Sequence, residues 1–301
     1  MSIYSYKVFN EVAKQGSFIR AAEILHITSS AVSHTIAKME EDIGFTLFVR
    51  DRKGVAITPD GVEVLERVQA LIKCDAKLDQ EIAQIAGLER GEITIGTFNS
   101  VMIEWLPDIL ERYHEKYPNI KVYVTQGGYE DVADLIKHAA VDIAFVTKAV
   151  SLDEDVSLLP IRREKIKCIT PASFVSPHGD KVKMDEIKDM SFVLPEQGYD
   201  AEFNMIFEKY KFTPNYEYAI KSDESILALV ERGLGIALMP ELAAEHTTAD
   251  IKKFSLDPEE YRTIELAVPH PEFVTPAANA MKDEILDYLK EKDLYNIEEE
   301  Q

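Results

Sequence analysis

A short run of polar side chains near residue 30 has the composition and spacing of a DNA-reading surface. If residues 29–43 form a helix, Ser29, Ser30, Ser33, His34 and Lys38 lie on or beside the face opposite an apolar row. Hydroxyl and imidazole groups on such a face can reach base edges or phosphates in a major groove. We predict base or phosphate contacts for the three serines and His34, and a phosphate contact for Lys38.

A second basic group, Arg50, Arg52 and Lys53, surrounds a polar turn. Extended segments at 46–50 and 55–58 flank this turn, which is the pattern of a β-hairpin wing. We predict phosphate contacts for all three side chains. For three residues of the predicted helix, a purely structural role also stays open. Ser29 and Ser30 could merely cap that helix, and Lys38 could be a solvated charge.

Three short helices are needed to position these groups. The first ends at Gly16, the second begins after Ser17, and the third runs from about 29 to 43 and stops at Gly44. The turn 26–28 between the second and third is so tight that the pair reads as a helix-turn-helix. The apolar row of the third helix faces inward and consists of Val32, Ile36, Met39 and Ile43.

A long helix is predicted from Pro59 to about residue 86, with Thr58 as its cap and Gly87 as its stop. Apolar residues recur along it every seven positions, as expected of a helix that pairs with a second copy. Alternatively, the stripe packs on the chain's own C-terminal part, and Asp75 weakens a strict two-stranded coil. The two rows are Val64, Leu71, Leu78 and Ile85, and Val68, Asp75 and Ile82.

Beyond Gly91, strands and helices alternate in two βαβαβ units, each with a parallel sheet, and the last helix returns to the first unit. The fold class is therefore α/β with an all-α, winged head, and a ligand cleft is expected between the two lobes. We predict a winged helix-turn-helix at 1–58, a linker helix at 59–90, a first lobe at 91–161 and 266–293, a second lobe at 162–265 and a flexible tail at 294–301.

Charge is divided unevenly along the chain. The formal net charge is −21, but residues 1–58 contain seven Lys or Arg and six acids, so the head is +1 and the rest −22. This fits a DNA-binding head on an acidic body. The sequence has no apolar run long enough to cross a membrane and no signal peptide, so we expect a cytoplasmic protein. Cys74 and Cys168 are far apart, and we expect them to be inert rather than redox-active.

A set of residue types recurs at fixed offsets along the chain: Phe9, Val12, Gly16-Ser17-Phe18, Ala21-Ala22, Leu25, Ala31-Val32-Ser33, Ile36, Glu40, Gly44, Leu47-Phe48, Arg50, Thr58, Gly61, 91–96 and 233–240. In this pattern residues 9–61 closely resemble the DNA-binding head of LysR-type transcriptional regulators, and the layout of the whole chain is similar to theirs. Ser29, His34 and Lys53 depart from the glutamine, the arginine or glutamine, and the arginine common in the family, so half-site preference is expected to differ. The resemblance implies a two-lobed, periplasmic-binding-protein-like effector domain.

A small-molecule site is expected where strand 92–97 meets a helix. The helix N-terminus there favours an anion, which makes a carboxylate-bearing effector the leading class. Glu196 and Asp223 would repel an anion, so an amino or hydroxyl group on the effector is also open. A purely structural role is the alternative to ligand binding: Asn99, Ser100 and Ser222 would only cap helices, and Gly127-Gly128 would only form a turn. The candidate residues, several of them implied by the resemblance, are Thr97, Asn99, Ser100, Gln126, Gly127, Gly128, Val146, Thr147, Glu196, Gln197 and Ser222.

The chain lacks the motifs of the enzyme classes that use α/β lobes, namely GxSxG, the P-loop, GxGxxG and HExxH, so we predict no enzyme, no cofactor and no metal. The expected partners are double-stranded DNA, a small-molecule effector, further copies of the chain in a homodimer or homotetramer, and RNA polymerase. Family resemblance implies that effector binding alters the spacing and bending of DNA. A constitutive or partner-controlled regulator stays open, and a closed cleft filled by side chains would support it.

Overall fold

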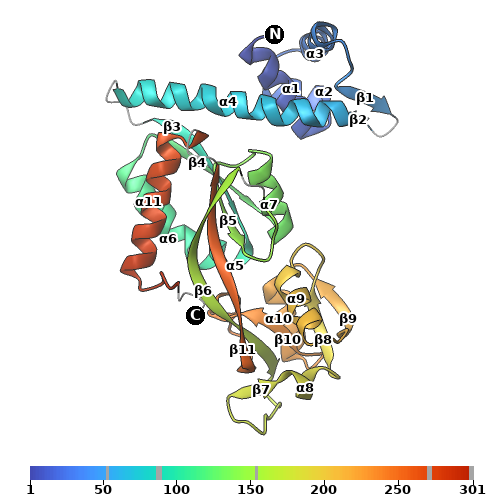
Figure 1. The fold of residues 1–301 in the computed structure, drawn as a ribbon, viewed down its shortest axis with the longest axis vertical. Coiled ribbons are helices and arrows are strands. Elements are labelled where there is room, and N and C mark those ends of the chain that lie inside the picture. Colours follow the sequence, from blue (N-terminus) through green and yellow to red (C-terminus); the bar gives the residue numbers. More distant parts are fainter. Residues whose placement is uncertain (52–53, 86–89, 153–154, 270–272, 298–301) are drawn as a thin grey trace. The chain divides into compact units, whose positions relative to one another are not determined.

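The computed structural model describes residues 1–51, 54–85, 90–152, 155–269 and 273–297, which form two compact units. The first unit is built mainly from residues 1–89 and the second mainly from the remainder. None of the helices in these ranges is both long and apolar enough to cross a membrane. Figure 1 gives the element labels used below.

The first unit has the predicted helix-turn-helix, wing and long helix (Figure 1). Thr28 caps α3 by accepting a hydrogen bond from the Ala31 N–H, so neither Ser29 nor Ser30 is the N-cap. The wing hairpin pairs Arg50 with Val55. The elements are α1 (Ile3–Gln15), α2 (Phe18–Ile24), α3 (Ser29–Ile43), β1 (Phe48–Asp51), β2 (Gly54–Ile57) and α4 (Pro59–Ile85).

The core of the head joins all of these elements. Two sets of close contacts hold the wing next to α3 and α4. Glu40 accepts hydrogen bonds from the Leu47 and Phe48 N–H groups at 2.7 and 3.2 Å, and Gly61 lies so close to the Leu47 carbonyl that an added Cβ would sit 2.4 Å from that oxygen. Glycine is therefore required at 61. The buried apolar residues are Val8, Phe9, Val12, Ala21, Ala22, Val32, Ile36, Met39, Leu47, Phe48 and Val68.

The apolar stripe of α4 divides in two along the helix. Val64 and Val68, near its start, pack into the core of the head. Leu71, Leu78 and Ile82 are roughly half exposed, although they continue the same rows. The start of α4 thus belongs to the head, while its later apolar positions have large exposed surfaces.

The second unit contains two lobes joined by two long strands, β6 (Val156–Pro171) and β11 (Ile251–Pro269), which pair antiparallel along most of their length. Both strands run through both lobes (Figure 1), so the predicted lobe boundaries near 161 and 265 fall inside them. The prediction of purely parallel sheets was wrong at this point, because β11 also pairs antiparallel with β5. The sheet order is β10-β6-β11-β5-β3-β4, with β7 paired to β11.

The first lobe has the predicted parallel strands and covering helices. The connection between β3 and β4 contains two helices rather than one, because the backbone leaves the helical conformation at Trp105. The first-lobe elements are β3 (Gly91–Thr97), α5 (Asn99–Glu104), α6 (Leu106–Lys116), β4 (Ile120–Gln126), α7 (Tyr129–Lys137), β5 (Ile143–Thr147) and α11 (Pro276–Glu291).

The second lobe has its own parallel pair, β8 with β9, next to the distal half of the long strands. Its apolar core includes Cys168, whose pKa is raised to about 12 by burial, in keeping with an inert thiol. The elements are β7 (Lys181–Lys183), α8 (Met184–Ile187), β8 (Ser191–Pro195), α9 (Ala201–Lys209), β9 (Asn215–Ile220), α10 (Asp223–Glu231), β10 (Ala237–Pro240) and the short 3₁₀ turn η1 (Leu242–Ala244).

The C-terminal segment corrects one prediction. A flexible tail was expected from residue 294, but the Asn296 carbonyl accepts a hydrogen bond from the Arg163 N–H at 2.8 Å, and Asn296 forms a bridge with Arg162 of β6. Residues 294–297 are therefore held against the second unit; positions 298–301 lie outside the described residues.

Candidate functional site

The exposed side of α3 carries most of the predicted DNA contacts. Ser29, Ser30, His34 and Lys38 are exposed, and Ser33 is half-buried. The Ser30 hydroxyl lies 3.0 Å from the Thr28 hydroxyl, in the turn that leads into the helix. The surface thus offers small hydrogen-bonding groups at the start of α3 and an imidazole one turn later, which suits contact with base edges.

Lys38 is less available than its exposure suggests. Its ammonium lies 3.0 Å from a carboxylate oxygen of Glu41 and 3.1 Å from one of Asp42. Hydrogen bonds to these two acids raise the pKa of Lys38. A phosphate contact from Lys38 must therefore compete with two acids on the same helix. Of the wing cations, Arg50 is described only through its backbone in β1, and Arg52 and Lys53 lie outside the described residues.

In the second unit, the two lobes meet around α5. Asn99 donates a hydrogen bond to Asp223 of α10 at 3.0 Å, and Gln126 donates one to Asn99 at 3.0 Å. Glu104 lies 2.5 Å from His246, which follows η1. The Asn99–Asp223 and Glu104–His246 contacts join the two ends of α5 to the second lobe, and Gln126 holds Asn99 in place.

Gly128 lies in close contact with the second lobe. A Cβ at this position would lie 2.6 Å from the Gly198 carbonyl oxygen and 2.9 Å from the Tyr199 ring. The Glu130 N–H also donates to the Gly198 carbonyl, at 3.4 Å. Gly128 is therefore more than a turn residue, because any larger side chain would separate the lobes.

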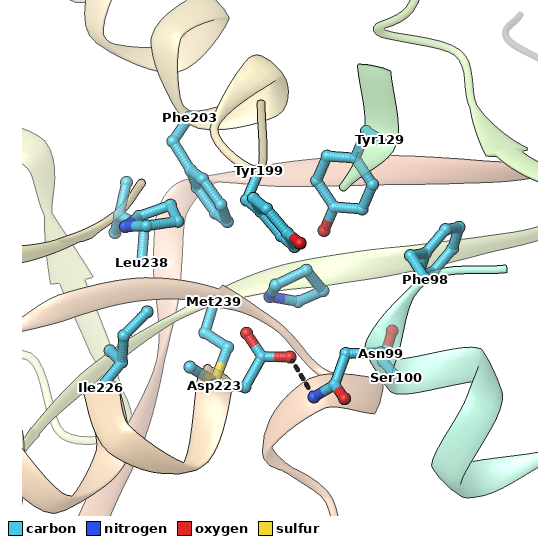
Figure 2. Close-up of a pocket in the computed structure, with 12 residues that line it drawn as sticks. Phe98, Asn99, Ser100, Tyr129, Tyr199, Phe203, Asp223, Ile226, Leu238 and Met239 are labelled. Carbon is cyan, nitrogen blue, oxygen red and sulfur yellow. Dashed lines mark hydrogen bonds between the residues drawn. The ribbon is translucent and has the colours of Figure 1, made fainter. Parts of the chain in front are cut away.

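A narrow cavity remains between the lobes (Figure 2), and we call it the interlobe cavity. Its free volume is about 20 Å³, enough for about one water molecule. Figure 2 shows the aromatic rings of Tyr129, Tyr199 and Phe203 crowding one side and the Asn99–Asp223 hydrogen bond closing another. Its lining is Phe98, Asn99, Ser100, Tyr129, Pro195, Tyr199, Phe203, Asp223, Ile226, Leu238, Met239 and Pro240.

Behind this cavity lies the fully buried guanidinium of Arg262, in β11. It donates to Glu164 of β6 at 2.9 Å, to the Tyr129 hydroxyl at 2.8 Å and to the Ser100 hydroxyl at 3.2 Å. Burial acts to lower the pKa of Arg262, but Glu164 and its other neighbours raise it above the ordinary value. Phe98 stacks on this cation, with 5.0 Å between the guanidinium carbon and the ring centre. The cluster is charged and buried, and the two connecting strands β6 and β11 hold it.

Two further acids lie close to this cluster. Burial raises the pKa of Asp223, which the Asn99 hydrogen bond and Arg262 oppose. Burial also raises the pKa of Glu202 in α9, opposed by Arg262 and by the Thr147 hydroxyl. The neighbourhood of Arg262 therefore contains more acidic than basic groups, which disfavours a simple anion as ligand.

Comparison with known proteins identifies the family. The family model described as LysR substrate binding domain matches residues 86–290, and the one described as bacterial regulatory helix-turn-helix protein, lysR family, matches residues 3–62. The chain belongs to the LysR family. It is a DNA-binding transcriptional regulator with an effector-binding domain and not an enzyme, and the predicted fold class is confirmed.

Known proteins match two thirds or more of the chain. The transcriptional dual regulator GltC of Bacillus subtilis is 26% identical over 300 residues, which cover 98% of this chain and 100% of GltC. Among solved structures, full-length OxyR of Pseudomonas aeruginosa has a TM-score of 0.76 at 20% identity, covering 95% of this chain and 98% of that one. The effector-binding domain of QuiR in complex with shikimate has a TM-score of 0.59 at 21% identity, covering 67% of this chain and 98% of that domain.

The predicted effector residues of this LysR regulator divide into three groups. Asn99 and Ser100 line the interlobe cavity, with Gln126 and Gly128 at its edge. Val146 packs in the core of the first lobe, and the buried Thr97 hydroxyl bonds to the adjacent Phe98 carbonyl. The remaining candidates lie outside the lining: Gly127 is bonded to the Thr97 carbonyl, Thr147 is buried near Glu202, Glu196 and Gln197 are exposed, and Ser222 caps α10.

Sequence reasoning missed the central cation and most of its partners. Arg262, Tyr129 and Glu164 come from three distant segments, and no local pattern links them. No local signal pointed to Arg262, because its strand also contains Lys252, Lys253, Asp257, Glu259, Glu260 and Glu265. Among the described ranges, no group of three or more His, Cys, Asp or Glu side chains could hold a metal ion.

Proposed function

We propose that this LysR regulator binds a small carboxylate-bearing molecule that also carries an amino or hydroxyl group, in an opened form of the interlobe cavity. The observation that carries this proposal is the Arg262 guanidinium bonded to Ser100, directly behind the cavity lining. The planar fork of an arginine guanidinium can bind both oxygens of a carboxylate at once. Asp223 faces the same space, so a donor group on the effector would replace the Asn99 hydrogen bond.

Entry of such a molecule requires the lobes to separate. A free volume of about 20 Å³ does not hold a metabolite, and Asn99–Asp223 and Gly128–Gly198 close the space. Effector binding would therefore stabilise a more open arrangement of the effector domain. QuiR binds shikimate, a hydroxylated carboxylate, in a domain of similar fold.

The output we propose is a change in DNA spacing and bending. The exposed Leu71, Leu78 and Ile82 of α4 support pairing with a second copy into a dimer, and two dimers would make the tetramer expected for the family. We propose Ser29, Ser30, Ser33 and His34 as base or phosphate contacts and Lys38, Arg50, Arg52 and Lys53 as phosphate contacts. Acting on chromosomal DNA, the protein would work in the cytoplasm, and contact with RNA polymerase would transmit the signal.

A thermal-shift screen of the full-length protein against hydroxy and amino carboxylates tests the effector proposal. A ligand at about 100 times its Kd adds about 2.7 kcal/mol to the stability of the folded state. We expect a stabilising compound whose effect Ser100→Ala abolishes and Ser29→Ala, an exposed hydroxyl of the head, preserves. DNase I footprints and bend angles measured with this compound then test the output, and an unchanged footprint and bend would contradict it.

The narrow, side-chain-filled cavity also favours a second candidate, a regulator that is constitutive or controlled by a protein partner. In that case the lobes act only in assembly. Absence of any stabilising compound, together with DNA binding and transcription that no compound alters, would support this alternative.

His34 offers a direct test of DNA reading. His34→Ala is expected to change sequence preference, whereas Lys53→Ala is expected to weaken all operator variants alike and to lower the salt dependence of binding by about one unit. Binding to a panel of operator variants at several salt concentrations measures both. Equal losses on every sequence for both variants would contradict this division between base and phosphate contacts.

A further inference from the structure

A second cavity lies on the other side of Arg262, between α9 and the crossing strand β11. Its volume is about 530 Å³, much larger than the interlobe cavity. We call it the hinge cavity. Its described lining is Lys148, Ala149, Arg163, Glu202, Met205, Ile206, Lys209, Glu259, Glu260, Tyr261, Arg262 and Thr263.

The hinge cavity is distinct from the interlobe cavity but shares a wall with it. Arg262 lines the hinge cavity and bonds to Ser100 and Tyr129, which line the interlobe cavity. In α9, the consecutive residues Glu202 and Phe203 likewise belong to opposite cavities. A ligand in the hinge cavity would therefore act on the same arginine as an effector in the interlobe cavity.

Glu202 is a buried acid of this lining whose carboxylate has no hydrogen bond. The residue is only 6% exposed, and neither carboxylate oxygen has a hydrogen-bond partner within the described chain. The buried Thr147 hydroxyl acts to lower the pKa of Glu202, against the larger effect of burial, but the two groups do not reach hydrogen-bond geometry, and the hydroxyl has no other partner within the described chain. A buried carboxylate left without donors is costly and rare in folded proteins. A donor supplied by a ligand would remove this cost.

The other charges of the cavity are mostly satisfied within the protein. Lys209 pairs with Glu260 at 2.7 Å, and Glu259 pairs with Lys165 at 2.7 Å. Two cations stand apart from this pattern. Lys148 is exposed, and Arg163 stacks 3.8 Å above the ring of Tyr261.

Neither of these cations has a carboxylate within ion-pair distance among the described side chains. Burial raises the pKa of Glu265, and the charge of Lys148 partly opposes this rise. The cavity thus has a buried anion at one place and two available cations nearer solvent. Ala149, Met205 and Ile206 add apolar surface to the lining.

We propose that the hinge cavity is a second small-molecule site and that it takes a zwitterion, an amino acid. The ammonium group would donate to Glu202, and the carboxylate would face Lys148 and Arg163. A positive charge placed beside Glu202 would also reduce the attraction between Glu202 and Arg262. Occupancy of the hinge cavity would therefore change affinity at the interlobe cavity, and the reverse.

Calorimetric titration of the full-length protein with each proteinogenic amino acid and with γ-aminobutyrate tests this site. We expect at least one to bind, with an affinity that Glu202→Gln lowers by about 10-fold or more, as for a lost hydrogen bond to a charged group. Glu208→Gln removes an exposed acid from the same helix and is the matched control, with affinity unchanged.

Two further variants distinguish binding in the hinge cavity from a folding defect and from binding in the interlobe cavity. Arg163→Ala should weaken amino-acid binding and leave the weaker binding of the matched decarboxylated amine unchanged, which a mere folding defect would not do. Ser100→Ala, which changes the hinge cavity only through Arg262, should lower the affinity much less than Glu202→Gln does. The proposal is overturned if no compound in the panel binds, if Glu202→Gln binds as tightly as the wild type, or if Ser100→Ala abolishes binding and Glu202→Gln does not, since that pattern places the ligand in the interlobe cavity.

Discussion

The DNA-binding head and the effector domain place their functional groups in opposite ways. In the head, Ser29, Ser30 and His34 are exposed on one helix and contribute nothing to the apolar core. In the effector domain, Ser100, buried near the Glu164–Arg262 ion pair, bonds to an arginine 162 positions away. The head separates recognition from stability, whereas the effector domain uses the same groups for both.

The difference follows from what each region must do. Reading DNA needs groups that already face solvent, so an amphipathic helix is sufficient. A ligand that changes the arrangement of two lobes must interact with groups that join them, because only differential contacts can shift a conformational equilibrium. Variants in the effector domain should therefore change stability and response together, and variants on the reading face of α3 should change DNA binding alone.

The largest expected effect is that of Arg262→Ala. It leaves Glu164 buried without its cation, and breaking a buried pair in this way costs about 3–5 kcal/mol. Trp105, the sole tryptophan, is buried in the effector domain, so its fluorescence during urea unfolding reports on that domain. Arg232→Ala, at an exposed arginine, is the control. A loss below about 1 kcal/mol would mean that the cluster does not hold the lobes together.

Gly61→Ala tests whether the head, like the effector domain, depends on one tightly packed contact, here between α4 and the Leu47 carbonyl. The new Cβ would meet the Leu47 carbonyl, and the forced backbone shift should cost about 1–3 kcal/mol. We expect loss of DNA binding with an unchanged unfolding transition of Trp105. Val62→Ala, at a neighbouring exposed position, should leave both unaffected. DNA binding at wild-type affinity in Gly61→Ala would show that the wing and α4 can move apart at little cost.

Glu202→Gln should change the pH dependence of stability in the effector domain. The pKa of Glu202 is raised by burial from its ordinary 4.5, so its favourable contribution is complete below pH 4.5 and is lost as pH rises through the folded-state pKa. Relative to the wild type, the glutamine variant should gain stability across that rise, by at most about 1.4 kcal/mol per pH unit. Urea midpoints of Trp105 fluorescence against pH measure this; parallel curves would show that Glu202 titrates normally.

The smallest effect is expected for Lys38→Ala, a variant on the reading face of the head that should change only DNA binding. Because Glu41 and Asp42 already bind this ammonium, the salt dependence of DNA binding should fall by less than the roughly one unit of a free phosphate contact. Thermal stability should stay unchanged. A decrease of a full unit or more, measured by fluorescence anisotropy at several salt concentrations, would show that Lys38 leaves its acidic partners on DNA.

The sequence by itself determined the elements whose signals are local. Periodicity and caps predicted α3 at its observed bounds, the start of α4 at Pro59 and the alternation of strands and helices beyond Gly91. The polar face of α3 followed from the same periodicity, because residues three and four apart share a helix face. The loop at Asn99 and Ser100 could be predicted as a site, since it lies at the end of a strand and the start of a helix.

Only the tertiary structure decided which distant groups meet. The antiparallel pairing of β6 with β11 brings Arg262 to Glu164, and closure of the lobes brings Asn99 to Asp223. Long-range packing also buried Glu202, an acidic residue of α9. These partners are set by long-range packing and by the burial of charge, and neither leaves a periodic trace along the chain.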